Sequence, residues 1–284
     1  MSVTVFECLA CPLDGQSLTR QGNAWQCSQG HSFDIAREGY VHLLPVQNKR
    51  SREPGDSKAM VAARQRFLNA GHYEAIAAAI NEAVLAGMLA GTGTSTACLD
   101  AGCGEGYYLR ELGKVVPENL ELGVLGLDIS KWAVRSAAKQ DGQATWVVGT
   151  NAHLPVADNS IDRLLCVFGF PVFEEFARVI KPGGRLIMVD PGPAHLRELR
   201  EIIYPTLIER PESDRIYPEP FQSLDCQTVT HRLKLDGEQS IADLLAMTPH
   251  LYRAPAAGVA KAMALTQLEV TLDVRVQLLV STPD

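Results

Sequence analysis

The segment Leu99-Asp-Ala-Gly-Cys-Gly-Glu-Gly-Tyr107 joins an apolar, strand-like run to a helix-like run through three glycines. Glycines in such a turn let the backbone approach a ligand closely, and the helix that follows offers unpaired N–H groups. The spacing is G-x-G-x-G, whereas a dinucleotide-binding loop needs a further glycine or alanine where Tyr107 stands. Asp128 ends the next apolar run, where a carboxylate can accept hydrogen bonds from both hydroxyls of a ribose. The pattern therefore predicts a nucleoside ligand without a pyrophosphate.

Around this loop, short apolar runs alternate with helix-like segments, which predicts an α/β fold with a parallel sheet covered on both faces. The expected strands are 97–100, 122–128, 145–149, 163–169 and 185–190, and the expected helices between them are 105–116, 131–139 and 172–180. Two later strand-like runs, 226–235 and 268–280, lack this rhythm, and the second alternates as an antiparallel strand would. We therefore expect a seven-stranded, mostly parallel sheet within a domain of residues 96–284.

Residues 1–45 contain too few apolar residues to form a stable hydrophobic core by themselves, so we expect a cross-link, such as a metal ion, to stabilise them. Cys8-x2-Cys11 is followed, fifteen residues later, by Cys27-x3-His31. Two close pairs of thiol and imidazole ligands suit one tetrahedral zinc ion, and four protein ligands leave no open position for catalysis. The sequence thus predicts a small β module with a structural zinc. The alternatives are a chance grouping or a redox-active cysteine pair.

Residues 46–95 are expected to form a basic linker and a helical segment. A first helix should begin after a cap at Asp56 or Ser57 and end at Asn69, and a second should span 73–89. The net charge is −7, but residues 1–70 carry +2 and the remainder carries −9. A local positive field of this kind is typical of a surface that binds nucleic acid. A solvated linker and helix face remains the alternative interpretation.

The composition excludes several classes of protein. With 284 residues, 46% of them hydrophobic and 21% charged, the chain is not disordered, collagen-like or coiled coil. No run approaches the roughly 18 apolar residues of a membrane span, and the first fifteen residues lack the features of a secretory signal. Seven unevenly spaced cysteines argue against a disulfide framework. We therefore expect a cytoplasmic protein without a membrane contact.

A third motif adds to the glycine loop and Asp128. Lys181-Pro-Gly-Gly184 is expected to end a helix immediately before the fifth strand. In this order, the three features resemble the Rossmann-like S-adenosylmethionine-dependent methyltransferases. The resemblance implies that the nucleoside ligand is S-adenosylmethionine. The loop geometry and the position of Asp128 themselves predict Gly102 and Asp128 as cofactor contacts.

The zinc pattern followed by the methyltransferase motifs resembles one family over nearly the whole chain, the bacterial 23S ribosomal RNA (guanine-N1)-methyltransferases in their Gram-negative form. Beyond the zinc pattern and glycine loop, the segments that carry this likeness are Glu38-Gly-Tyr-Val-His-Leu-Leu-Pro45, Lys49-Arg-Ser-Arg-Glu-Pro-Gly-Asp56, Ala70-Gly-His-Tyr73, Gly126-Leu-Asp-Ile-Ser-Lys131, Pro191-Gly-Pro193 with His195-Leu196, and Met247-Thr-Pro249. The stretch Val167-Phe-Gly-Phe-Pro171 departs from the family's pattern.

The resemblance implies methyl transfer to N1 of guanine 745 in a 23S rRNA hairpin, by a homodimer that contains zinc. It places the zinc ligands at Cys8, Cys11, Cys27 and His31. It places further cofactor contacts at Tyr73, Gly104, Glu105 and His195. Together with the charge pattern, it assigns RNA contacts to Lys49, Arg50, Arg52 and Arg64. Candidates for stacking on the target base are Phe168, Phe170 and Tyr107, and no general base can be named from the sequence.

Three other functions would account for part or all of these features. A small-molecule methyltransferase would use the cofactor loop but leave the zinc pattern and basic linker without a role. A zinc-ribbon binding protein with an inactive methyltransferase fold would be expected to have lost the glycines or Asp128, which are present. A methyltransferase acting on another RNA, such as tRNA, fits every feature derived from the residues, and only the family resemblance separates it.

Overall fold

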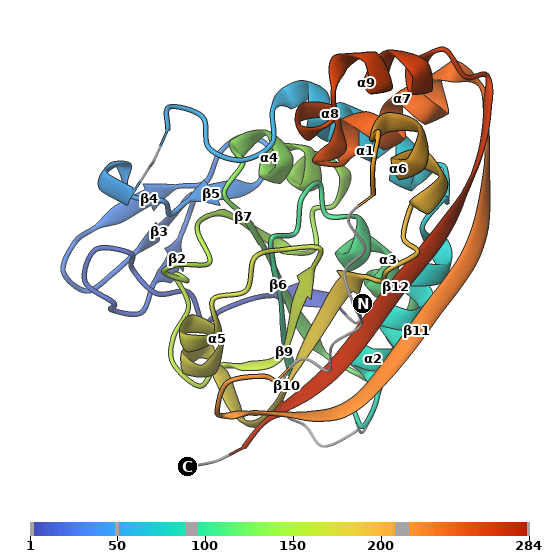
Figure 1. Ribbon diagram of the computed structural model, residues 1–284. Coiled ribbons are helices and arrows are strands. Elements are labelled where there is room, and N and C mark those ends of the chain that lie inside the picture. Colours follow the sequence, from blue (N-terminus) through green and yellow to red (C-terminus); the bar gives the residue numbers. More distant parts are fainter. Residues whose placement is uncertain (1–2, 49–50, 89–95, 208–215, 283–284) are drawn as a thin grey trace.

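A mixed β-sheet forms the centre of the computed structural model, which describes residues 3–48, 51–88, 96–207 and 216–282 (Figure 1). Within these residues the sheet has nine strands, namely β1 (Val3–Val5), β5 (Tyr40–His42), β6 (Thr96–Ala101), β7 (Leu122–Asp128), β8 (Thr145–Val148), β9 (Ile161–Val167), β10 (Ile180–Pro191), β11 (Phe221–Asp236) and β12 (Gln267–Ser281). Their order is β11-β12-β10-β9-β6-β7-β8-β5, and β1 pairs with β7.

The seven strands expected from the sequence are confirmed, and the sheet is larger than expected. Strands β6 to β10 run parallel, while β11 and β12 add to β10 in antiparallel fashion. The two extra strands come from the N-terminal 45 residues: β1 pairs with the first half of β7, and β5 pairs with β8. Parallel pairing brings the carboxyl ends of β6, β7, β9 and β10 to one edge, where ligands bind in open α/β sheets.

The helices are α1 (Lys58–Asn69), α2 (Glu74–Leu85), α3 (Tyr107–Val115), α4 (Lys131–Gln140), α5 (Phe173–Val179), α6 (Arg197–Ile203), α7 (Glu238–Met247), α8 (His250–Arg253) and α9 (Ala256–Met263), with a 3-10 turn at Val46–Asn48. The expected cap of α1 is confirmed, since the Ser57 side chain accepts a hydrogen bond from the backbone N–H of Met60 at 3.3 Å. Helix α5 ends before Lys181, so the Lys181–Gly184 turn is an irregularity near the start of β10 and not the end of a helix.

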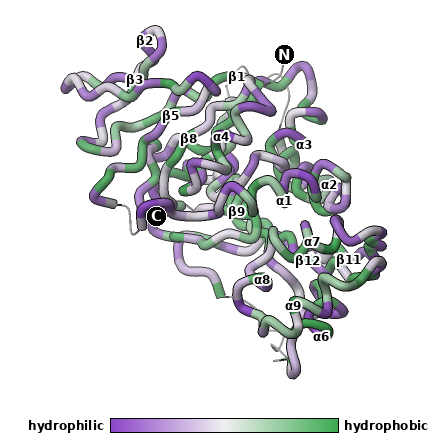
Figure 2. Tube along the Cα trace, turned by 90° about the horizontal axis from the view of Figure 1, so that it is seen from above, coloured by the Kyte–Doolittle hydropathy of each residue, from purple (hydrophilic) through white to green (hydrophobic). Residues whose placement is uncertain are grey.

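The two faces of the sheet are covered differently. Helices α1 to α4, α6 and α7 pack on one face, with buried side chains such as Ile80, Leu112 and Val134. On the other face, α5 is joined by the N-terminal module, residues 3–45, which contributes Leu9, Leu18 and Trp25 to the same hydrophobic cluster as sheet residues. The module holds its own small sheet, β2 (Thr19–Gln21), β3 (Ala24–Gln26) and β4 (Ser32–Asp34). It lies at the opposite end of the molecule from α6 to α9 (Figures 1 and 2).

The N-terminal module takes the place of a missing crossover helix. Residues 149–160, which connect β8 to β9, form no helix. The module pairs with this connection instead, because the backbone N–H of Ala10 donates to the carbonyl of Pro155 at 2.9 Å and that of Ala157 donates to the carbonyl of Cys8 at 3.0 Å. The N-terminal module, including Cys11 and Cys27, and the central sheet therefore share one core. No described helix has both the length and the apolar character to cross a bilayer.

Candidate cofactor and zinc sites

The glycine loop is tied to the end of β7 by backbone hydrogen bonds. The N–H groups of Gly102 and Cys103 donate to the carbonyl of Leu127 at 2.8 and 2.9 Å. The N–H of Gly104 donates to Oδ2 of Asp128 at 2.9 Å. The structure thus brings together Gly102, Gly104 and Asp128, three residues that the sequence predicts to contact the cofactor.

The glycines of the loop serve different purposes. Gly102 has φ +107°, and a Cβ added there would meet nothing within 4 Å, so the loop borders open space at this point. A Cβ on Gly104 would meet only the Arg64 side chain, at 3.4 Å from Nη1. On Gly106 it would come within 2.6 Å of the Trp146 ring, so this glycine allows the helix to pack on the sheet. The space for a ligand therefore lies beside Gly102 and Gly104.

Asp128 is positioned to bind hydroxyl groups. Its Oδ1 accepts from the N–H of Ser130 at 2.7 Å, while Oδ2 accepts from Gly104. Each carboxylate oxygen has two lone pairs, so both retain the capacity to accept from a ribose. Burial raises the pKa of Asp128, and its two backbone hydrogen bonds oppose that rise.

Asp100 is a site residue to which the sequence analysis gave no role. Its side chain is fully buried, and neither carboxylate oxygen has a hydrogen-bond partner within the described part of the chain. Burial and the charge of Asp128 raise the pKa of Asp100 to about 8. A buried carboxyl group without a partner is costly, and a positively charged ligand would relieve that cost. S-adenosylmethionine carries a sulfonium and an ammonium, so the acidic residues here fit this cofactor.

Glu105 makes its contacts elsewhere. Its carboxylate accepts from Arg110 Nη2 at 2.9 Å and from Gln140 Nε2 at 2.6 Å, and it is almost fully buried. These partners come from α3 and α4. A cofactor contact at Glu105 would therefore use its backbone N–H, which precedes α3.

Three aromatic rings gather at the carboxyl ends of β9 and β10. The rings of Tyr73 and Phe168 lie 6.3 Å apart, those of Phe168 and His195 5.8 Å, and those of Tyr73 and His195 6.5 Å. Phe168 has φ +51°, a conformation that is uncommon for a bulky residue and that often marks functional sites. We call these three residues the aromatic cluster. It unites two predicted cofactor contacts with one predicted base-stacking residue.

The other two stacking candidates lie outside this cluster. Phe170 is 84% exposed. Tyr107 is 4% exposed and packs edge-on against Tyr108, so it belongs to the core. Of the three candidates, Phe168 is the one that packs against Tyr73 and His195.

The ring of His195 accepts one backbone hydrogen bond, which determines its tautomer. Its Nδ1 faces the backbone N–H of Asp273 at 3.3 Å and therefore acts as the acceptor. Burial lowers the pKa of His195 to about 4, so the ring is neutral at pH 7. A neutral imidazole that accepts at Nδ1 carries its proton on Nε2. His195 can thus donate a hydrogen bond through Nε2, but that atom cannot take a proton from a substrate.

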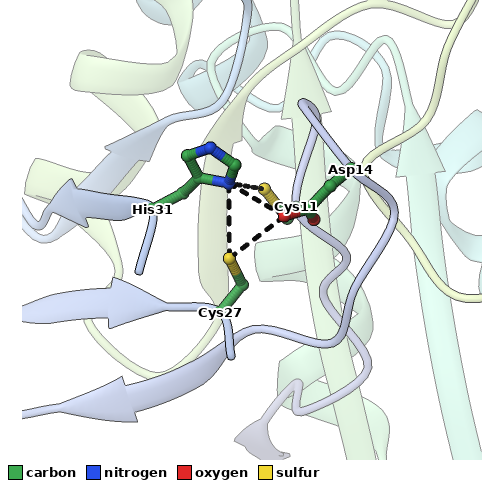
Figure 3. Close-up of side chains that lie close together, drawn as sticks. All are labelled: Cys11, Asp14, Cys27 and His31. Carbon is green, nitrogen blue, oxygen red and sulfur yellow. Dashed lines mark hydrogen bonds and ion pairs between the residues drawn. The ribbon is translucent and has the colours of Figure 1, made fainter. Parts of the chain in front are cut away.

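The N-terminal module contains a compact cluster of possible metal ligands, Cys11, Asp14, Cys27 and His31 (Figure 3). The ligand atoms all lie within 4.8 Å of one another. The sulfurs of Cys11 and Cys27 are 3.5 and 3.4 Å from Nδ1 of His31. In a tetrahedral zinc site, bonds of about 2.3 Å to sulfur and 2.0 Å to nitrogen place those atoms about 3.5 Å apart. The cluster therefore has the dimensions of a zinc site.

The structure differs from the predicted ligand set at one position. Cys8 is exposed and stands outside the cluster, while its backbone carbonyl pairs with Ala157. Asp14 fills the fourth corner, with Oδ2 2.9 Å from Nδ1 of His31 and 3.4 Å from the Cys27 sulfur. A backbone hydrogen bond from Gln16 is the main reason that the pKa of Asp14 is lowered to about 2. Cys8 remains a predicted ligand, and Asp14 is a competing one.

Of the four predicted RNA-binding residues, the structure describes Arg52 and Arg64, and these two have different surroundings. Lys49 and Arg50 lie outside the described residues, and Arg52 is exposed. Arg64 pairs with Asp56 at 2.5 Å and donates to the carbonyl of Met247 at 3.0 Å. Its guanidinium lies against the glycine loop, as described above for Gly104. Of the described residues of this set, Arg52 is thus exposed, whereas Arg64 makes contacts within the fold.

Comparison with known proteins gives separate matches for the N-terminal module and for the domain that contains the central sheet. Residues 9–52 match a zinc-ribbon family described as RlmA, N-terminal, and residues 99–188 match a methyltransferase domain. A 23S rRNA (guanine(748)-N(1))-methyltransferase of Streptomyces fradiae is 31% identical over 88% of this chain and 87% of its own length. The chain belongs to the 23S rRNA (guanine-N1)-methyltransferase family.

Two further relatives support this assignment. A candidate 23S rRNA (guanine-N(1)-)-methyltransferase of Micromonospora griseorubida is 35% identical and covers 94% of this chain and 95% of that protein. A second candidate of the same description, YxjB of Bacillus subtilis, is 31% identical with 95% coverage of both chains. The family expectation from the sequence is confirmed, as is the S-adenosylmethionine-dependent methyltransferase fold with its zinc module.

Proposed function

We propose that this protein transfers a methyl group from S-adenosylmethionine to N1 of a guanine in a hairpin of 23S rRNA. The observation that carries the proposal is the aromatic cluster at the carboxyl edge of the sheet. Its Phe168 directly follows β9, which pairs with β6, the strand that contains the unpaired Asp100 and leads into the glycine loop. A guanine must leave its stack before N1 becomes accessible, and an aromatic surface beside the cofactor compensates for lost stacking. The full-length relatives named above support rRNA as the substrate.

The residues of this chain position the reactants. Gly102, Gly104 and Asp128 would hold the nucleoside part of the cofactor, which supplies a methyl group on a sulfonium leaving group. Phe168 would stack on the guanine, and Nε2 of His195 would donate a hydrogen bond nearby. Because sulfonium leaves readily, much of the rate can come from holding N1 in line with the methyl group. Guanine N1 must also lose its proton, and we assign that step to no residue.

We further propose position 745 as the target, on the basis of the resemblance to the Gram-negative form. Zinc is assigned a structural role, because the cluster of Cys11, Cys27 and His31 lies in the N-terminal module and not at the carboxyl edge of the sheet. Arg52, with Lys49 and Arg50, is proposed to contact RNA phosphates. We also propose that the protein is a homodimer and that it acts in the cytoplasm.

A methylation assay followed by primer extension tests the activity. Tritiated S-adenosylmethionine is supplied with unmodified 23S rRNA hairpins, and reverse transcriptase should stop at an N1-methylated guanine. We expect a stop that reports position 745. A stop at 748 would correct the position, whereas label in tRNA but not in rRNA would refute the substrate.

Two variants connect the activity to the aromatic cluster. Phe168→Ala should reduce methyl transfer to the hairpin much more than Phe170→Ala, because only Phe168 adjoins Tyr73 and His195. Both variants should bind S-adenosylhomocysteine in calorimetry. Equal activity of the two variants would exclude Phe168 as the stacking residue. Sedimentation analysis, with and without the hairpin, tests the homodimer.

A further inference from the structure

Arg64 lies in the cofactor site, although it belongs to the basic run that the sequence assigns to RNA. It is on α1, a helix that precedes the methyltransferase sheet in the chain. Its Nη1 is 3.4 Å from the position of a Cβ built on Gly104, so the guanidinium sits directly on the glycine loop. Its positive charge opposes the rise that burial causes in the pKa of Asp128, and it acts in the same sense on Tyr73. Arg64 therefore lies against the glycine loop and is close enough to Asp128 and Tyr73 to influence their ionisation.

The segment before α1 is fixed to the same site. The carbonyl of Asp56 accepts from the hydroxyl of Ser130 at 2.7 Å, two residues beyond Asp128. Gly55 has φ +80°, and an added Cβ would come within 2.9 Å of Ile129 and Ser130. The Asp56 carboxylate is thereby placed to hold Arg64 at 2.5 Å, with both side chains about one quarter exposed. This ion pair is reachable by a ligand that enters the site.

Arg66, on the same helix, differs from Arg64 because its contacts serve only the packing of two helices. It binds both carboxylate oxygens of Asp243 on α7, at 2.9 and 2.6 Å, and the Asp243 side chain is 6% exposed. Arg64 instead pairs with Asp56 through Nη1 and donates a hydrogen bond from Nη2 to the carbonyl of Met247. A guanidinium has five N–H donors in a planar fork, so Arg64 has donors to offer a second carboxylate.

The charges of the site match the two ends of the cofactor's amino-acid part. Asp100 and Asp128 are buried carboxyl groups whose ionised form a sulfonium or an ammonium would stabilise. The same acidic residues would repel the α-carboxylate of S-adenosylmethionine unless a cation met it. Arg64 is that cation at the edge of the loop.

We propose that Arg64 binds the α-carboxylate of S-adenosylmethionine, which takes over from Asp56 as the partner of the guanidinium. Arg64 thus recognises the cofactor, and Asp56 holds the side chain in place until the cofactor arrives. The inference rests on the cofactor part of the proposed function and is independent of which RNA is methylated.

Calorimetry with two ligands isolates the carboxylate contact. S-adenosylhomocysteine has the carboxylate, and its decarboxylated analogue, S-adenosyl-3-thiopropylamine, lacks it but keeps the ammonium. A charge-assisted hydrogen bond is worth roughly 1.5 to 3 kcal/mol, so the full-length zinc-loaded protein should prefer S-adenosylhomocysteine by about ten- to a hundredfold. In Arg64→Gln this preference should fall to within about twofold, while the affinity for the analogue changes little.

Three further variants make the test decisive. Asp56→Asn should bind S-adenosylhomocysteine at least as tightly as the wild type, because it removes a competitor for Arg64. Arg66→Gln should retain the full preference between the two ligands, because Arg66 serves only the contact with Asp243. If Arg64→Gln does not fold, Arg64→Lys replaces it and should show a reduced preference, since lysine lacks the forked donors.

The outcomes separate this inference from the proposed function. If Arg64→Gln weakens both ligands equally, or if Asp56→Asn and Arg64→Gln cause the same loss, the ion pair is only structural and the inference is wrong. An unchanged preference in Arg64→Gln also refutes it. A wild-type protein that binds neither ligand would refute the cofactor assignment itself.

Discussion

Replacing Asp100 with asparagine should change how the stability of the protein depends on pH. The folded protein holds a proton on this carboxyl group up to a pKa of about 8, whereas the unfolded chain releases it near pH 4. The folded state therefore binds more protons than the unfolded state between these two values. Stability from this group is fully present below pH 4 and is lost progressively as the pH rises towards 8. Asparagine does not titrate in this range, so the stability of Asp100→Asn should not fall for this reason as the pH rises.

The size of the effect follows from the linkage relation. One pH unit within this window corresponds to about 1.4 kcal/mol, so between pH 6 and 7.5 the wild type should lose about 2 kcal/mol relative to Asp100→Asn. Urea unfolding followed by circular dichroism, with zinc saturating and cofactor absent, measures both proteins across this range. Because asparagine closely matches a protonated aspartate in shape, the two should be most similar in stability at the acidic end.

Adding cofactor supplies an internal check. A ligand with positive charge near Asp100 favours the ionised carboxylate, so saturating S-adenosylmethionine should shrink the pH-dependent difference between the two proteins. If the difference in free energy of unfolding between the two proteins stays constant from pH 6 to 7.5 without cofactor, a raised pKa at Asp100 is refuted. A difference that S-adenosylmethionine leaves unchanged would place Asp100 outside the cofactor site.

Three other predictions concern single residues. Asp128→Ala should weaken S-adenosylmethionine binding by roughly ten- to a hundredfold in calorimetry, through loss of charge-assisted hydrogen bonds, and an unaltered affinity would remove Asp128 from the site. Cys8→Ser should release zinc, whereas Asp14→Asn should keep about one ion per chain by mass spectrometry, and the reverse result would make Asp14 the fourth ligand. Arg52→Gln should flatten the dependence of log RNA affinity on log salt by roughly 0.7 to 0.9, and an identical slope would show that Arg52 meets no phosphate.

The central sheet could be predicted from the sequence because its signals are local. The bounds of β7 match the expected strand, Leu122–Asp128, and the Ser57 cap marks the start of α1. Helix α7 was not predicted, although Ile241, Leu244 and Leu245 show helical spacing. Its buried face meets α1, far away in the chain, and a ten-residue amphipathic segment gives only a short signal.

The candidate site was predicted where a motif is contiguous and missed where a partner is distant. The glycine loop and Asp128 form one unit, as the spacing suggested. A run of basic residues does not show which of its members find partners inside the fold: Arg64 contacts the carbonyl of Met247, 183 residues later. A single acidic residue such as Asp14 or Asp100 also carries no spacing signal, so only the structure assigns it a place.

The shared core of the N-terminal module and the sheet limits how such an enzyme can be engineered or evolve. Because Leu9, Leu18 and Trp25 cover the face that a crossover helix would otherwise protect, a chain shortened to begin after residue 45 would expose a broad apolar surface and aggregate. A module grafted from a relative would have to match that surface as well as bind metal. New target preferences would therefore arise more readily through changes in exposed loops than through exchange of whole modules.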